Sequence, residues 1–213
     1  MTATHRQANG AHKAAIRQEN EHLILAAAER VFADYGFKGA TTARIAEIAN
    51  VPKANVHYYF STKEMLYRRI MEDVCSHWLD AAMTFDNSAN PAEVLRGYIE
   101  AKMDLSRARP HGSRIWAHEI IRGAKFSSDY ISTTVKSWLD SRVVVLKRWI
   151  AEGKMDAVEP YSLMYMIFAT TQHYADFARQ IEIFNNDAPL SDEQFAEAKE
   201  NVVRIILKGV GLF

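Results

Sequence analysis

The sequence lacks the features that mark membrane and secreted proteins. No apolar run approaches the length of about 18–20 residues that spans a bilayer, and the N-terminus has no hydrophobic segment of the kind that directs secretion. The single cysteine, Cys75, excludes an internal disulfide and fits a reducing compartment. These absences predict a cytoplasmic protein with no membrane partner.

Motifs of the common enzyme classes are missing as well. We find no glycine-rich phosphate loop, no HExxH pair and no nucleophile within a triad signature. Four histidines have a spacing that matches no known metal site: His77, His111, His118 and His173. We therefore expect no enzyme activity, no catalytic residue, no metal and no cofactor, with a metal-responsive regulator as an alternative.

The net charge of the chain is zero, but the charged residues are unevenly distributed along it. The 213 residues carry 26 basic and 26 acidic side chains, and 48% of the residues are apolar, as in an ordinary globular protein. Residues 1–63 hold eight Lys or Arg against five acids, so this part carries +3 and the remainder −3. A basic head on an acidic body is typical of a DNA-binding domain joined to a domain of another kind.

Strand alternation and internal repeats are absent, and apolar residues recur at helical spacing along the chain. The predicted fold class is therefore all-α, with about nine helices. Their expected ranges are 18–35, a short pair within 36–62, 63–85, 92–108, 112–121, 127–152, 160–184 and 191–208. Ser191 and Gln194 have the spacing of a capping box at the start of the last helix.

Residues 36–67 predict two short helices around a tight turn. In the first helix, Ile45, Ile48 and Ala49 fall on one face, as a short packed helix requires. Thr41 or Thr42 can cap its start.

The second helix of the pair opens at Pro52, after a helix stop at Asn50, a residue type that tolerates the left-handed conformation. It is expected to bury Val56 and Phe60. The side chains left facing outward are polar or basic: Lys53, Asn55, His57 and Tyr58. This is the arrangement of a helix-turn-helix motif with its DNA-reading face.

The same region carries a longer pattern. It reads Gly36-Phe37-x-Gly39-x-Thr41-Thr42-x-x-Ile45-Ala46, then Ala49-x-Val51-x-Lys53-Ala54-Asn55-Val56-x-Tyr58-Tyr59-Phe60-x-x-Lys63-Glu64-x-Leu66. This pattern resembles the TetR family of bacterial one-component transcription regulators. The chain departs from that family at Asn50, where glycine is usual, and at His57, where tyrosine is frequent.

The resemblance implies a TetR-like fold with a defined domain order. Residues 1–17 have few apolar side chains and are expected to form a flexible basic arm, and a helix-turn-helix DNA-binding domain follows at residues 18–62. A helical body, residues 63–213, then binds a ligand and dimerises. The implied function is that of a ligand-responsive transcriptional regulator, a repressor in most of the family, that binds a palindromic DNA operator and leaves it when a small-molecule effector binds.

Eight residues on or beside the second helix of the pair are candidates for DNA contacts. Phosphate neutralisation supplies affinity, and base edges supply specificity. The phosphate candidates are Thr42, Tyr58, Tyr59 and Lys63, and the base-edge candidates are Lys53, Ala54, Asn55 and His57. Tyr59 also fits a core position, and the arm fits either a disordered terminus or a DNA contact.

A helix-turn-helix this small is expected to act as a homodimer that reads two half-sites. The last two helices have apolar stripes that can form a four-helix bundle between two copies, with internal core as the alternative. The stripes comprise Met164, Ile167, Phe168, Thr171, Ala175 and Ala178, and Phe195, Val202, Ile205 and Ile206.

The body resembles the pyrimidine-utilisation regulators within the TetR family. The likeness rests on Arg114-Ile115-Trp116-x-x-Glu119-x-x-x-Gly123-Ala124, Gly153-Lys154-Met155 and Thr171-Gln172-His173-Tyr174-Ala175-Asp176-Phe177-Ala178. It implies uracil or thymine as ligand, with Trp78, Phe168 and Gln172 in the pocket, where Phe168 replaces a tryptophan. Gln172 can both donate to and accept from the –NH–C=O edge of a flat ring, and His118 is a further polar candidate.

Other interpretations of the body stay open. Trp78 and Phe168 also fit simple core positions. The body fits an unrelated apolar ligand as well, and the whole chain fits an all-helical interaction protein without DNA binding. The outward-facing Lys53, Asn55 and Tyr58 argue against this last interpretation.

Overall fold

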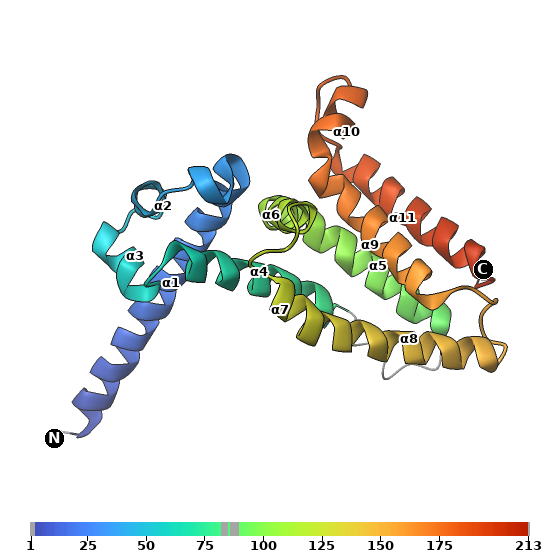
Figure 1. Ribbon diagram of the computed structural model, residues 1–213, viewed down its shortest axis with the longest axis horizontal. Helices are drawn as coiled ribbons and strands as arrows, with labels where there is room; N and C mark the ends of the chain where they lie inside the picture. Colours follow the sequence, from blue (N-terminus) through green and yellow to red (C-terminus); the bar gives the residue numbers. More distant parts are fainter. Residues whose placement is uncertain (1–2, 82–84, 86–89, 213) are drawn as a thin grey trace. The chain divides into compact units, whose positions relative to one another are not determined.

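The computed structural model describes residues 3–81, 85 and 90–212, with side chains from residue 14 onward, and these residues form helices and no strand (Figure 1). The helices are α1 (Ala3–Gly39), α2 (Thr42–Ile48), α3 (Lys53–Tyr59), α4 (Lys63–Asp80), α5 (Pro91–Ala108), α6 (Pro110–Ile121), α7 (Ser128–Tyr130), α8 (Lys136–Ala151), α9 (Pro160–Asp176), α10 (Ala178–Phe184) and α11 (Asp192–Gly209). A π-helical turn, η2 (Ile131–Val135), joins α7 to α8. The all-α prediction is confirmed.

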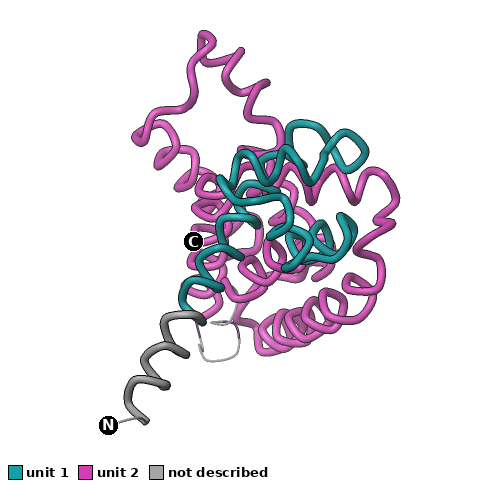
Figure 2. Tube along the Cα trace, turned by 90° about the vertical axis from the view of Figure 1, so that its left-hand side faces the viewer, with its two compact units in different colours: residues 1–71 teal, residues 72–213 magenta. Residues whose placement is uncertain are grey.

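The chain divides into two compact units, residues 1–71 and 72–213 (Figure 2). The division falls within α4, whose single helix runs from Lys63 to Asp80. The predicted domain limit at residues 62 and 63 lies at the start of this helix. The chain therefore passes from one unit into the other without leaving helical structure.

α1 begins at Ala3, earlier than the start at residue 18 that we predict. Residues 3–17 contain five alanines and two arginines, which have high helix propensity, and no proline. Most side chains of the predicted basic arm, residues 1–17, lie outside the described residues, and its role stays a prediction. Near the other end, Gly36 has φ 64° and ψ 173°, a conformation that suits glycine and turns the chain toward α2.

Local sequence explains the start and burial of α2. Oγ1 of Thr41 accepts a hydrogen bond from the backbone N–H of Arg44 at 3.2 Å, so Thr41 is the cap. The prediction that Ile48 is buried is wrong, because Ile48 is 43% exposed and Ala46 joins Ile45 in the core. α2 packs against both α1 and α3, so its buried face widens toward Ala46.

The turn before α3 has the expected chemistry. Asn50 adopts φ 52°, the left-handed conformation of a helix stop. Pro52 immediately precedes α3, whereas the sequence predicts it as the first residue of that helix. Val56 and Phe60 are buried as predicted.

The core of the first unit draws on all of its helices. Its buried residues include Ile24, Ala28, Phe32, Ile45, Val56, Leu66 and Ile70. Tyr67 meets the Phe32 ring edge-on at 4.9 Å and the Phe37 ring at 5.2 Å, which joins α4 to α1. These contacts fix the helix-turn-helix against the first part of α4.

In the second unit, α5 packs against both α9 and α11, and α6 packs against α9 (Figure 1). The predicted helix 160–184 is divided at Phe177, where φ −114° and ψ 26° end α9 and a new helix, α10, begins. The capping box at the start of α11 is present, with Ser191 and Gln194 each bonded to the backbone of the other.

The apolar stripes predicted for a subunit interface lie mostly inside the second unit. Seven of them are buried: Met164, Ile167, Thr171, Ala175, Phe195, Val202 and Ile206. Phe168 and Ala178 are half-buried, and Ile205 is 61% exposed. Helical spacing identifies a buried face but not what covers it, and for these seven residues the cover is the same chain.

Candidate DNA interface and effector site

α3 presents an exposed polar surface. Tyr58 is 74% exposed, and Lys53, Ala54 and His57 are exposed as well, whereas Asn55 is half-buried. Lys53 and Ala54 stand in the first turn of α3, the part of a recognition helix that reaches base edges. The surface therefore suits insertion into a major groove by its N-terminal end.

His57 is held from outside α3. Its Nε2 atom lies 3.4 Å from Oγ1 of Thr42 at the start of α2, which is within hydrogen-bond distance. The contact couples a phosphate candidate to a base-edge candidate. It also restrains the orientation of the exposed imidazole.

Lys63 and Tyr59 have contacts within the first unit. Nζ of Lys63 donates to the carbonyl oxygen of Ala40 at 3.0 Å and lies 4.6 Å from the centroid of the Phe37 ring. Tyr59 is half-buried and meets the Tyr58 ring edge-on at 5.3 Å. One ammonium donor of Lys63 thus fastens α4 to the turn before α2, and DNA contact stays a prediction for both residues.

Two of the predicted effector residues, Trp78 of α4 and Phe168 of α9, belong to an aromatic group that also contains Trp116 and Trp138. Trp78 is 7% exposed and meets Trp116 edge-on at 5.8 Å. Phe168 lies 6.4 Å from the ring of Trp138, and Gln172, one turn further along α9, is half-buried. Aromatic side chains from several helices therefore surround Trp78 and Phe168, the residues at which we predict a planar ligand.

Lys102 of α5 joins Trp78 to Phe168, and no motif in the sequence pointed to it. Its Nζ lies 4.7 Å from the Trp78 ring centroid and 5.1 Å from that of Phe168. The side chain is 2% exposed, and burial lowers its pKa to about 8. One signal was present in the sequence, because Lys102 interrupts the apolar row that runs through Leu95 and Tyr98.

A second polar group of the same unit centres on Asp176 of α9. Oδ1 of Asp176 accepts a hydrogen bond from Oγ of Ser113 at 2.6 Å. Burial raises the pKa of Asp176, and the hydrogen bond from Ser113 and the charge of His118 act in the opposite direction. His118 itself is exposed on α6.

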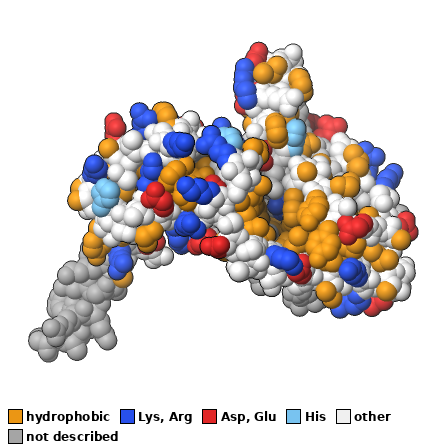
Figure 3. All heavy atoms as spheres, in the orientation of Figure 1, with side chains coloured by type: hydrophobic (Ala, Val, Ile, Leu, Met, Phe, Trp, Pro, Cys, Tyr) orange, Lys and Arg blue, Asp and Glu red, His pale blue; other side chains and the backbone are white. Residues whose placement is uncertain are grey.

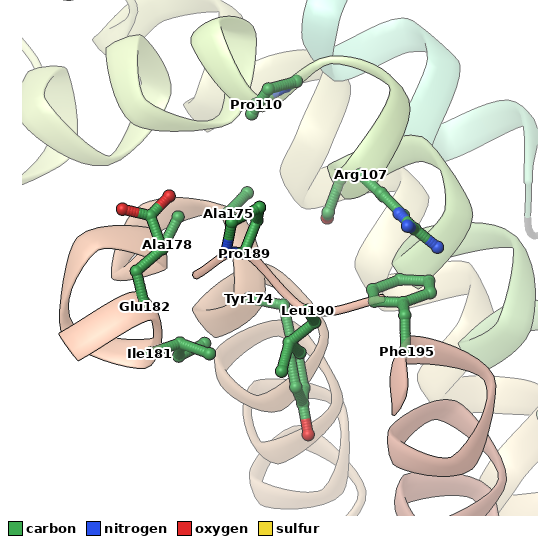
Figure 4. A pocket seen from close by; sticks show the side chains of 11 residues that line it. Arg107, Pro110, Tyr174, Ala175, Ala178, Ile181, Glu182, Pro189, Leu190 and Phe195 are labelled. Carbon is green, nitrogen blue, oxygen red and sulfur yellow. The ribbon is translucent and has the colours of Figure 1, made fainter. Parts of the chain in front are cut away.

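A pocket of about 220 Å³ opens elsewhere in this unit (Figure 4). It is lined by Ser106, Arg107, Pro110, Tyr174, Ala175, Ala178, Ile181, Glu182, Pro189, Leu190 and Phe195. Ser106 is buried, and its Oγ has no hydrogen-bond partner among the described residues. None of the predicted effector residues lines this mostly apolar pocket.

The described residues hold neither a cluster of metal-ligating side chains nor a membrane-spanning helix. Across residues 14–81, 85 and 90–212, no three or more His, Cys, Asp or Glu side chains are arranged to hold a metal ion. No helix of the described part is long and apolar enough to cross a membrane.

Two family profiles match the chain. The profile described as "Bacterial regulatory proteins, tetR family" matches residues 24–70, and the one described as "YcdC-like protein, C-terminal region" matches residues 71–213. The HTH-type transcriptional regulator RutR of Escherichia coli strain K12 is 37% identical over 188 residues, which cover 88% of each chain.

Solved structures share the fold. The TetR family transcriptional regulator PfmR from Thermus thermophilus matches with a TM-score of 0.70 at 17% identity, over 87% of this chain and 97% of that one. AibR, in complex with isovaleryl coenzyme A and operator DNA, matches with a TM-score of 0.67 at 22% identity, over 86% and 96% of the two chains.

Proposed function

Because the chain belongs to the TetR family and is a ligand-responsive, DNA-binding transcriptional regulator, we propose that it represses from a palindromic operator as a homodimer and leaves the DNA when a planar nitrogen heterocycle binds. The relatives have a regulatory role and not an enzymatic one. The effector class rests on one observation above all: Trp78 and Phe168, from two helices, face the same buried ammonium group.

DNA recognition is assigned to the exposed face of α3 together with Thr42. Lys53, Ala54 and Asn55 read base edges from the first turn, and His57 does so in the orientation that Thr42 sets. Tyr58, Tyr59 and Lys63 contact phosphates. A gel-shift titration against DNA selected from a random pool tests this: Lys53→Ala should relax the base preference, whereas a variant with unchanged preference would remove Lys53 from the reading face.

The homodimer is assigned to the outer faces of α9 and α11. Tyr165 and Met166 of α9 are 56% and 55% exposed, and Ile205 of α11 is exposed as well. Figure 3 shows hydrophobic side chains gathered on the surface of the second unit. Exposed apolar residues on two long helices suit a four-helix bundle between two copies. Sedimentation of the full chain tests this, and a monomer at micromolar concentration would contradict it.

The effector is assigned to the aromatic group, with Gln172 as the amide that pairs with the –NH–C=O edge of the ring and His118 as a residue near its entrance. Uracil and thymine are the first ligands to test, by thermal shift. Gln172→Ala should abolish the shift and keep DNA binding. Loss of both would mark Gln172 as a structural residue, and no shift with either ligand would overturn the assignment.

Coupling between the two functions is assigned to α4, which contains both Lys63 and Trp78. An effector beside Trp78 favours one pose of this helix, and the DNA-competent pose becomes less populated. Coupling free energies of this kind are typically about 1–3 kcal/mol, and they are reciprocal. Operator DNA should therefore weaken effector binding by the same factor by which the effector weakens DNA binding.

A second candidate effector is an apolar compound in the pocket around Ser106 and Phe195. Its mostly apolar lining favours this alternative, and its volume of about 220 Å³ suits only a small compound. Ala178→Trp should fill the pocket. If this variant keeps its response to uracil while Gln172→Ala loses it, the aromatic group is the effector site; the opposite pattern would favour the pocket.

A further inference from the structure

Lys102 is a buried cation without a polar partner in the described part of the chain. The side chain is 2% exposed, and among the described residues its Nζ forms no hydrogen bond and no ion pair. Lysine is among the residues least often buried in folded proteins, and a buried charge is normally paired. A buried ammonium group without a hydrogen-bond or ion-pair partner is therefore a candidate functional group.

The surroundings of the ammonium group are aromatic. Nζ lies 4.7 Å from the ring centroid of Trp78, 5.1 Å from that of Phe168 and 6.0 Å from that of Tyr98. These rings come from α4, α9 and α5. Their faces attract a cation, but they accept no ordinary hydrogen bond, so the three N–H donors keep their capacity to bind an acceptor.

The nearby titratable groups do not supply that acceptor. The Asp176 carboxylate acts on Lys102 through its charge, but the hydrogen bond that its Oδ1 accepts comes from Ser113. Cys75 is buried, and burial raises the pKa of its thiol to about 12, so it is neutral at pH 7. The site therefore holds a positive charge that none of its neighbours pairs directly.

We propose that Lys102 anchors the effector and that the effector binds as an anion, a flat ring that carries a carboxylate or has lost a proton from an acidic ring N–H. The rings of Trp78 and Phe168 pack on its faces, and Lys102 gives up part of its contact with them to donate to the anionic atom. This inference rests on the proposed aromatic effector site and specifies the charge of what binds there.

An anion fits this site better than a neutral carbonyl compound. A hydrogen bond between two charged groups is roughly twice as strong as one between neutral groups, and it cancels the charge that burial penalises. The pKa of about 8 keeps Lys102 mostly protonated at pH 7 while leaving it sensitive to a bound anion. Stacking on Trp78 and Phe168 alone does not distinguish an anionic ring from a neutral one. The preference for an anion therefore depends on the charge of Lys102.

Calorimetric titration with thymine and 5-nitrouracil tests the inference at pH 7. The two share one ring and differ at one substituent, and the nitro group acidifies the ring N–H so that the anion predominates. We expect the full-length protein to bind 5-nitrouracil at least tenfold more tightly than thymine. Lys102→Met should reduce this ratio to about one, whereas the exposed-lysine control Lys147→Met should keep it.

The outcomes separate the inference from the proposed function. If both ligands bind and Lys102→Met keeps the preference for 5-nitrouracil, the anionic anchor is wrong and the aromatic site stands. If neither ligand binds the unmodified protein, the aromatic site fails and the anchor fails with it. Circular dichroism and DNA binding check the fold of Lys102→Met, and Lys102→Gln, with the same expected ratio, replaces it if it does not fold.

Discussion

Replacement of Lys102 by methionine is expected to stabilise the ligand-free protein at pH 7. Burial lowers the pKa of Lys102 from its ordinary 10.5 to about 8, so the folded state holds this proton less firmly than the unfolded chain does. Methionine has a similar length, carries no charge and adapts to irregular space in a core. The substitution therefore removes the buried charge and keeps most of the packing.

The magnitude follows from two opposing contributions. The difference between pKa values of 10.5 and about 8 corresponds to about 3 kcal/mol, at about 1.4 kcal/mol per pKa unit. The contacts of the ammonium group with Trp78 and Phe168 offset about 1–2 kcal/mol of this penalty. The free energy of unfolding of Lys102→Met should therefore exceed that of the unmodified protein by about 1–2 kcal/mol.

The increase in the free energy of unfolding of Lys102→Met should become smaller as the pH rises. Below pH 8 the lysine is charged in both the folded and the unfolded state, and the penalty is complete. Between pH 8 and 10.5 the folded protein releases the proton while the unfolded chain still holds it, so the stability of the unmodified protein rises with pH. At higher pH neither state is charged, and the two proteins should converge.

Urea unfolding followed by circular dichroism, at pH 7 and pH 10 and at one protein concentration, measures these differences. The control Lys147→Met should change the free energy of unfolding by less than about 0.5 kcal/mol. If Lys102→Met destabilises the protein at pH 7 by more than about 1 kcal/mol, the ammonium group has a strong native partner and the reasoning is refuted.

Substitutions at three further positions test other parts of the molecule. Asn50→Val should destabilise the protein by about 1–2 kcal/mol, because a β-branched residue resists φ 52°. The control Asn50→Gly should change the free energy of unfolding by less than about 0.5 kcal/mol. Equal effects of the two substitutions in urea unfolding would remove the conformational explanation. Ser191→Ala should cost about 1 kcal/mol by removing the cap of α11, and an unchanged melting temperature would contradict this. Met166→Glu should weaken the proposed dimer at least tenfold in sedimentation equilibrium, and an unaffected dimer would place the interface elsewhere.

Local features of the fold could be predicted from the sequence because their causes are local. Thr41, Asn50 and the Ser191–Gln194 box act on the backbone within a few residues, and the structure has all of them in their expected roles. The error at Ile48 has a different cause. Its burial depends on how two other helices cover α2, and helical spacing along seven residues does not specify that cover.

The candidate effector site shows the same limit. The resemblance to known regulators pointed to Trp78, Phe168 and Gln172, and two of these do face a common group. That common group is the ammonium of Lys102, which the sequence analysis does not identify. Periodicity identifies rows of apolar residues, and it gives no weight to a single charged residue within such a row. Helical spacing likewise predicts the apolar stripes of α9 and α11, but their burial, largely against α5, depends on tertiary packing.

The central claim is that a ligand at the aromatic group lowers affinity for operator DNA. Fluorescence anisotropy tests it most directly, with operator DNA selected by the protein itself, at fixed salt and with increasing 5-nitrouracil. We predict a saturable loss of DNA affinity of about 5–150-fold in the unmodified protein, and no loss in Gln172→Ala. Unchanged DNA affinity at a concentration that saturates the protein in calorimetry would contradict the account.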